Sequence, residues 1–237
     1  MREFLVDAIG EDGLARCVVV VSTSDQPPLS RIRAALAATT VAEYFAAQGK
    51  HVLLVVDSLT RFAMAQREIG LAAGEPPTAK GYTPSVFSLL ARLLERAGHF
   101  GGGSITGFYT VLMEGDDQQD PLVDAVRAIL DGHILLDRRL AAQGHYPPIS
   151  ILDSISRLMP AICSPAHLAK AQRLRSLLSA YSASEDLIRV GAYQRGGDPL
   201  LDQALAALPA INAFLRQKKD DLVSLTATID AVMALPG

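Results

Sequence analysis

Residues 52–56 restrict the fold of this chain most, because five apolar residues in a row end directly on Asp57. A short unbroken apolar run closed by an acid is typical of a strand buried on both faces of a parallel sheet. In open α/β sheets, ligands bind beyond the carboxyl ends of the strands, where Asp57 would lie. A carboxylate there can hold Mg²⁺ through water. The alternative is that Asp57 and Ser58 only cap the following helix, and this pattern alone favours the cap.

Further apolar runs alternate with helical patterns along the chain. We expect a buried strand over residues 16–22 and others near residues 105–113, 133–136 and 148–152, with helices between them. This alternation indicates a parallel sheet with helices on both faces, so the predicted fold class is α/β. After residue 162 the pattern is helical only. We therefore predict two domains, an α/β domain over residues 1–162 and a small all-helical domain over residues 163–237.

Composition and charge narrow the possible partners. A net charge of −3 with mixed signs predicts neither a basic nucleic-acid surface nor a polybasic membrane anchor. The longest apolar runs are far too short to span a membrane, and the N-terminal residues lack a signal-peptide core, so we expect a cytoplasmic location. Cys17 and Cys163 have no CxxC spacing, and the five histidines are scattered. The sequence therefore predicts no transition-metal site.

A phosphate-binding loop of the form GxxxxGK[ST] does not occur in the sequence. The single Gly–Lys pair, Gly49–Lys50, is followed by His51 and precedes a predicted strand instead of a helix. If Asp57 belongs to a magnesium site, the loop that grips the triphosphate is missing from this chain. A sheet that lacks that loop's strand and helix is expected to expose apolar surface.

Several segments together resemble one protein family. The run SDQPPLSR to GYTPSVF, residues 24–87, resembles the core of the type III secretion and flagellar export ATPases, which are relatives of the rotary ATP synthase catalytic subunits. The later segments EGDDQQDP, ILDGHILLDRRLAAQGHYPPI and DSISRLMP resemble the same family in the same order, and LIRVGAYQRGGDPLLDQAL resembles its helical domain. The resemblance implies a RecA-like sheet flanked by helices, incomplete at its N-terminal side, and then a small helical C-terminal domain.

The resemblance also implies roles for four residues, with ATP and Mg²⁺ as cofactors. Asp57 matches the acid that orients Mg²⁺ and water beside the phosphates, and Tyr146 matches the aromatic residue that packs on adenine. Arg157 matches the arginine finger, which reaches the neighbouring subunit's nucleotide and can supply roughly 10³–10⁵ in rate. Arg61 can contact the nucleotide or, equally, stabilise the sheet edge and the subunit interface. Without the family, Tyr146 would be interpreted as a core residue and Arg157 as a surface residue.

The implied function is ATP hydrolysis by a homohexamer that drives chaperone release, unfolding and export of type III secretion substrates. The implied partners are chaperone–effector complexes, a central stalk protein and the inner-membrane export gate, with the ATPase peripheral to that membrane at the base of the apparatus. Family members carry the phosphate-binding loop and a catalytic glutamate upstream of the residues matched here, and Glu3 does not match that glutamate. We therefore expect this chain alone to be inactive.

Two alternatives stay open at this stage. The chain can be a non-catalytic docking module for chaperone–substrate complexes or for the central stalk. It can also be a hexameric nucleic-acid motor with the same core fold, although a net charge of −3 disfavours the basic channel that such a motor needs. Within the export family, the short C-terminus and the run HYPPISILDSISRLMP favour an injection apparatus over a flagellum.

Overall fold

The computed structural model describes residues 6, 9–113 and 120–236. The chain divides into two compact units, Met1–Leu130 and Asp131–Gly237, and each is described by itself. The domain boundary predicted at residue 162 lies within the second unit and stays a prediction. The segment EGDDQQDP, quoted for the family resemblance, lies mostly outside the described residues.

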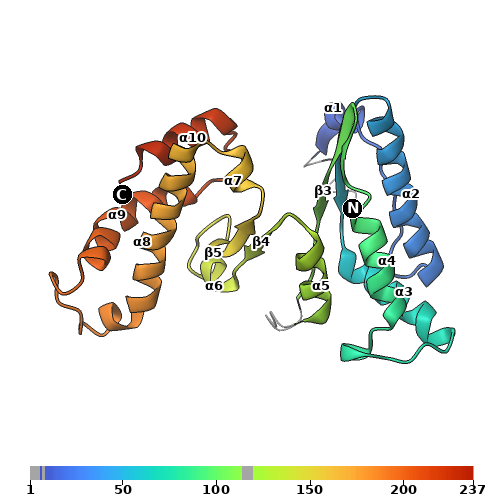
Figure 1. Ribbon diagram of the computed structural model, residues 1–237, viewed down its shortest axis with the longest axis horizontal. Helices are drawn as coiled ribbons and strands as arrows, with labels where there is room; N and C mark the ends of the chain where they lie inside the picture. The colour runs from blue at the N-terminus through green and yellow to red at the C-terminus, as the bar shows by residue number, and fades with distance from the viewer. Residues whose placement is uncertain (1–5, 7–8, 114–119, 237) are drawn as a thin grey trace. The chain divides into compact units, whose positions relative to one another are not determined.

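The first unit contains a three-stranded sheet in the order β1-β3-β2. β1 and β3 are parallel, and the short β2 pairs with β3 in the antiparallel direction. The strands are β1 (His51–Val56), β2 (Gly98–Phe100) and β3 (Gly103–Tyr109). The helical elements are α1 (Gly10–Leu14), α2 (Pro28–Ala47), α3 (Leu59–Ala72), the 3₁₀ turn η2 (Ala79–Gly81), α4 (Pro84–Leu94) and α5 (Pro121–Ile129). Figure 1 shows α2, α3 and α4 on one side of β1 and β3.

The two faces of the β1–β3 pair differ in burial. On one face, Leu54 and Ile105 pack with Ala42 and Ala46 of α2 in a buried cluster. On the other face, Leu53 is 63% exposed, and Val55 and its register partner Phe108 are also exposed. The prediction that β1 is buried on both faces is therefore wrong for the described residues. The apolar run could not reveal this, because an uninterrupted run contains no polar residue to mark an open face.

The strand predicted over residues 16–22 is absent from the structure. Residues 17–23 have no regular secondary structure, and Val18 to Val21 are all exposed. A strand needs a neighbour to accept and donate its backbone hydrogen bonds. High β-propensity in the sequence does not supply that neighbour, so the propensity alone did not produce a strand here.

Helices α3, α4 and α5 of the first unit share one core, and a carboxylate contact lies at the start of α4. Leu59, Phe62, Leu90 and Leu122 of α3, α4 and α5 are buried together. At the start of α4, the Glu75 carboxylate accepts a hydrogen bond from the backbone N–H of Ser85 at 3.1 Å. Hydrogen bonds from Ser85 hold the pKa of Glu75 below its ordinary value, because they stabilise the charged form.

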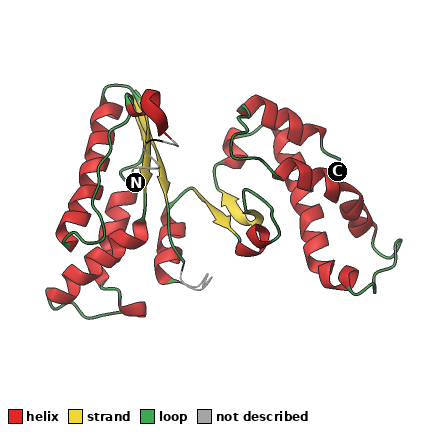
Figure 2. Cartoon of the chain, turned by 180° about the vertical axis from the view of Figure 1, so that it is seen from behind, coloured by secondary structure: helices red, strands yellow, loops and turns green. Residues whose placement is uncertain are grey.

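The second unit contains a two-stranded ladder followed by helices, as Figure 2 shows from behind. β4 and β5 lie in one antiparallel pair instead of extending a parallel sheet. A parallel crossover would need a helix about as long as the strand, roughly 16 Å for five residues, whereas a five-residue helix such as α6 covers about 7.5 Å. The elements are β4 (Gly132–Leu136), α6 (Arg138–Ala142), β5 (Ile149–Ser156), α7 (Met159–Ile162), α8 (Pro165–Arg189), α9 (Pro199–Leu215) and α10 (Leu225–Ala234).

The helical region predicted after residue 162 is confirmed. α8 begins at the predicted Ser164–Pro165 start, where the Ser164 hydroxyl accepts a hydrogen bond from the backbone N–H of His167. Leu174 and Leu177 of α8 pack against Ala204 and Ile211 of α9 in a buried cluster. Over the described residues, none of the helices has the length and apolarity required to cross a bilayer.

Candidate functional site

Asp57 lies directly after β1, at the carboxyl end of the parallel β1–β3 pair. Its side chain is exposed, and its Oδ1 accepts a hydrogen bond from the Thr110 hydroxyl at 2.8 Å. Thr110 follows β3, and its backbone N–H continues the ladder by donating to the carbonyl oxygen of Val56 at 3.0 Å. The Asp57–Ser58 peptide bond is cis. The structure therefore places Asp57 where open α/β sheets bind ligands.

The helix cap at this point belongs to Ser58 and not to Asp57. The Ser58 hydroxyl accepts a hydrogen bond from the backbone N–H of Arg61 at 3.4 Å, at the start of α3. Of the predicted cap formed by Asp57 and Ser58, the structure therefore supports the Ser58 part, while the Asp57 carboxylate binds Thr110 instead. Arg61 lies in the first turn of α3 with its side chain exposed, which leaves both of its predicted roles open.

The donor set at Asp57 suits a magnesium ion that is shared with a ligand. Mg²⁺ binds through one or two carboxylates together with substrate phosphates and water, and it prefers oxygen ligands. Asp57 and Thr110 supply a carboxylate and a hydroxyl. Within the described residues, no group of three or more His, Cys, Asp or Glu side chains could hold a metal ion by itself. The residues thus fit Mg²⁺ only as part of a metal–ligand complex.

Tyr146 lies in the second unit, ahead of β5, and is 57% exposed. The Tyr146–Pro147 peptide bond is cis, and the carbonyl oxygen of Tyr146 accepts a hydrogen bond from the backbone N–H of Gln217 at 2.9 Å. A core position, which would be the default interpretation of this tyrosine, does not agree with that exposure. The backbone is held while the ring faces solvent, an arrangement that suits an aromatic side chain that stacks on a ligand.

Arg157 also lies in the second unit, directly after β5, and its side chain is exposed. Its backbone N–H donates to the carbonyl oxygen of Asp131 at 2.7 Å, ahead of β4. The structure therefore places Asp57 and Arg61 in one unit and Tyr146 and Arg157 in the other. Sequence reasoning missed Thr110, because the strand predicted near residues 105–113 contained it, whereas β3 ends at Tyr109 and leaves Thr110 just beyond the strand.

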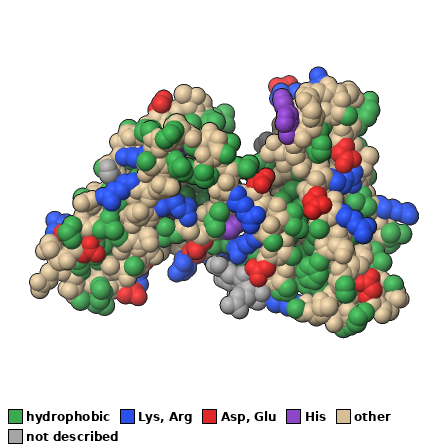
Figure 3. Space-filling view, viewed as in Figure 1, with side chains coloured by type: hydrophobic (Ala, Val, Ile, Leu, Met, Phe, Trp, Pro, Cys, Tyr) green, Lys and Arg blue, Asp and Glu red, His purple; other side chains and the backbone are tan. Residues whose placement is uncertain are grey.

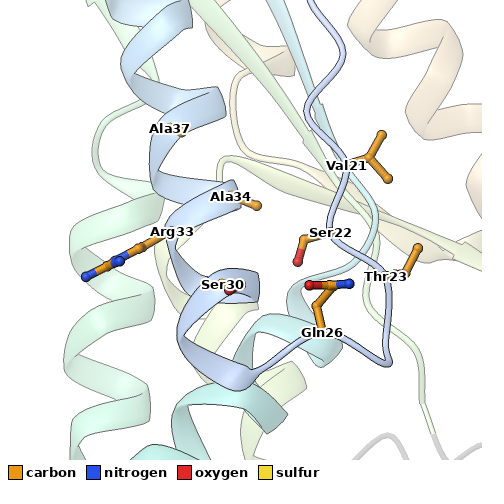
Figure 4. Close-up of a pocket in the computed structure, with 8 residues that line it drawn as sticks. All are labelled: Val21, Ser22, Thr23, Gln26, Ser30, Arg33, Ala34 and Ala37. Carbon is orange, nitrogen blue, oxygen red and sulfur yellow. The ribbon is translucent and has the colours of Figure 1, made fainter.

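A groove of about 420 Å³ lies in the first unit between the loop that follows the exposed valines and the N-terminal half of α2. Figure 4 shows the Ser22 and Gln26 side chains in the space between this loop and α2. The lining residues are Val21, Ser22, Thr23, Gln26, Ser30, Arg33, Ala34 and Ala37. All four predicted site residues lie elsewhere, so this groove contributes nothing to the candidate site.

Comparison with protein families gives matches in both regions of the chain. Residues 1–156 match the nucleotide-binding domain of the ATP synthase alpha/beta family. Residues 163–234 match the C-terminal domain of the type III secretion ATPase EscN. The two matched ranges meet close to the boundary predicted at residue 162.

Curated relatives match almost the whole chain. The flagellum-specific ATP synthase of Pseudomonas aeruginosa is 58% identical over 95% of this chain and 50% of its own length. That of Bacillus subtilis is 54% identical over 100% of this chain and 54% of its own length. The type 3 secretion system ATPase of Sinorhizobium fredii is 52% identical over 97% of this chain and 51% of its own length. This chain thus spans about half the length of the curated relatives it matches.

A solved structure agrees with these matches. The assembled ATPase EscN from the type III secretion system of enteropathogenic E. coli superimposes with a TM-score of 0.93 at 48% identity, over 98% of this chain and 56% of that one. EscN has also been solved in complex with its central stalk EscO, and that structure gives a TM-score of 0.86 at 47% identity, over 94% of this chain and 53% of that one. The chain belongs to the ATP synthase alpha/beta family, among the flagellar and type III secretion ATPases.

Proposed function

We propose that this chain supplies part of the active site of an ATPase that works as a homohexamer. The observation that carries the proposal is the Asp57 carboxylate, held by Thr110 at the carboxyl end of two parallel strands. It lies within the residues that match a nucleotide-binding domain. Bound Mg²⁺ would neutralise charge on the β- and γ-phosphates, and Asp57 would orient that ion and a water ligand.

Arg157 would act on the nucleotide of the neighbouring subunit. Its guanidinium lies exposed at the end of β5, and a planar donor fork suits the phosphate oxygens that gain charge in the transition state. Tyr146 would pack on the adenine of its own subunit. A homo-oligomer is required in this mechanism, because one chain uses Tyr146 for its own site and Arg157 for the next one. Arg61 would contact the nucleotide or support the subunit interface.

The proposed biological role is export. Hydrolysis would drive chaperone release, unfolding and export of secretion substrates at the base of the apparatus, on the cytoplasmic side of the inner membrane. Chaperone–effector complexes, the export gate and a central stalk would be the partners, and the complex of the relative EscN with its stalk EscO supports the last of these. Relatives from flagella and from injection systems match at 58% and 52% identity, so the expectation of an injection apparatus gains no support.

The decisive experiment is Arg157→Ala in the longest reading frame that contains this sequence. We expect kcat for ATP hydrolysis to fall roughly 10³-fold or more, because the transition state loses its trans-acting cation. Affinity for a fluorescent ATP analogue should stay within twofold. Arg189→Ala is the matched control, since Arg189 lies on α8 and pairs with Glu185 of the same helix at 3.0 Å. Turnover of Arg157→Ala at the level of the control would refute the assignment.

The second candidate function is a docking module without catalysis. Large apolar side chains of the second unit are exposed, with Leu222 at 98%, and Ile162, Val190 and Leu225 also lie in solvent. Such side chains suit contact with another protein. Release of phosphate from ATP by an assembly of the intact protein, lost on Asp57→Asn, would exclude docking as the sole function.

A nucleic-acid motor is the least supported function. On the face shown in Figure 3, basic and acidic side chains are interspersed, and the net charge is −3. A nucleic-acid channel would concentrate positive charge, and its affinity would fall steeply with salt. Measurement of RNA affinity at two salt concentrations distinguishes a nucleic-acid motor from a protein without such a channel. We expect weak binding at both salt concentrations.

A further inference from the structure

The β4–β5 ladder is interrupted just before Arg157. His133 pairs with Ile155, but the next pair is Leu135 with Ser150. Residues 151–154 of β5 therefore lie opposite the single residue Ile134 of β4. A bulge of this size leaves backbone groups that the partner strand cannot pair, and bulges of this kind often lie beside functional sites.

The carbonyl oxygens of this bulge all accept hydrogen bonds from side chains. The Arg175 Nη1 donates to Ile151 at 2.6 Å and to Ser154 at 3.1 Å, and its Nη2 donates to Leu152 at 3.0 Å. The His133 Nε2 lies 2.8 Å from the carbonyl oxygen of Asp153. A carbonyl oxygen can only accept, so this histidine nitrogen carries the proton.

Side chains within the strand complete the network. The Ser154 hydroxyl donates to the carbonyl oxygen of Ser150 at 2.6 Å and accepts from the backbone N–H of Leu135 at 3.0 Å. The Ser150 hydroxyl donates to the Asp153 carboxylate at 2.6 Å. These contacts fix the shape of the bulge, but they are local. Among the described groups that hold the bulge, only Arg175 lies outside the β4–β5 ladder, on the 25-residue helix α8.

We propose that Arg175 is a positioning residue for Arg157. It holds the bulge three residues ahead of Arg157, while the Gly132–Ser156 pairing and the hydrogen bond to Asp131 hold the strand end itself. The fork geometry of a guanidinium allows two nitrogens to serve three carbonyls at once, which a lysine ammonium cannot reproduce. This inference rests on the proposed role of Arg157 as the trans-acting arginine.

The test is a double-mutant cycle in the longest reading frame that contains this sequence. We expect Arg175→Met to lower kcat roughly 10- to 100-fold, since misplacement of a catalytic group by about 1 Å costs about that much. KM for ATP and affinity for a fluorescent ATP analogue should change by less than twofold, because the role concerns the neighbouring site's transition state. In the Arg157→Ala background, Arg175→Met should lower kcat no further, because it acts through Arg157.

Hydrogen exchange and a conservative variant distinguish a role of Arg175 in positioning Arg157 from a role in the stability of the whole fold. Arg175→Met should accelerate amide exchange in residues 150–157 and leave α8 and α9 protected, whereas Arg189→Met, on the same helix, should change neither exchange nor kcat. Arg175→Lys, which keeps the charge on a slightly shorter side chain, should show a smaller loss of kcat and provides the measurement if the methionine variant does not assemble. Full turnover by Arg157→Ala would refute the proposed function. An unchanged kcat in both Arg175 variants, or a further loss in the double variant, would overturn the inference about Arg175.

Discussion

The carboxyl ends of β1 and β5 both carry a predicted site residue, but they are built differently. β1 pairs in unbroken register with β3 from His51 to Val56, and Asp57 follows. β5 loses register with β4 over residues 151–154, and Arg157 follows after the pairing resumes. The backbone ladder and the buried core hold the carboxyl end of β1. At the carboxyl end of β5, backbone pairing holds the last two residues of the strand, and a network of side chains, with Arg175 as its link to α8, holds the bulge just ahead of them.

The two strand ends therefore suit different kinds of side chain. A regular ladder holds the backbone rigidly, which suits a short side chain such as that of Asp57, because the backbone then sets its position. A bulge redirects a strand, which suits a long side chain that must leave its own subunit. If this comparison is correct, substitutions near Asp57 should act through the core or through Thr110, and those near Arg157 should act through α8.

The largest expected effect in the first unit comes from Asp57→Asn. Loss of the charge should lower Mg²⁺-dependent turnover in the intact ATPase roughly 10³-fold, since charge stabilisation through a metal contributes several kcal/mol. A Mg²⁺ titration of the rate should also show a higher half-saturating concentration. Asp124→Asn on α5 is the control and should behave as the unchanged protein. Normal turnover with Asn at position 57 would make the strand end a structural feature only.

The sequence was sufficient to predict those elements whose formation depends on their own residues. The apolar run predicted β1 and the place of Asp57, and Ser164–Pro165 predicted the start of α8. It was not sufficient to predict elements whose formation depends on residues far away in the sequence. The valines of residues 16–22 lack a pairing strand, and the antiparallel course of β4 and β5 follows from a short α6. The bulge and its contact with Arg175 join residues more than 20 positions apart, which no local pattern encodes.

The next effect concerns stability and compares two adjacent leucines of β1. Leu54 is 6% exposed and packs against α2, whereas Leu53 is 63% exposed on the other face. Leu54→Ala should lower the free energy of unfolding by about 2–4 kcal/mol, through lost burial and a cavity. Leu53→Ala should lower it by less than about 1 kcal/mol in the isolated chain. Urea denaturation of both variants measures the difference. Equal losses would mean that the open face is covered in solution, and the contrast between the two faces of β1 would not stand.

The smallest expected effect comes from removing the hydrogen bond between Thr110 and Asp57, the side-chain contact of Asp57 seen among the described residues. Thr110→Val removes the hydroxyl that donates to Asp57 Oδ1 at 2.8 Å but keeps the shape of the side chain and the backbone contacts of residue 110 with Val56 and Leu59. A hydrogen bond to a charged, exposed carboxylate contributes about 1 kcal/mol, so kcat should fall about fivefold. Thr110→Ser, which retains the hydroxyl, should restore most of that loss. If Thr110→Val equals the unchanged protein in kcat and in Mg²⁺ dependence, the backbone ladder alone positions Asp57. That result would sharpen the contrast with Arg157, because one strand end would then need no side-chain support and the other would depend on it.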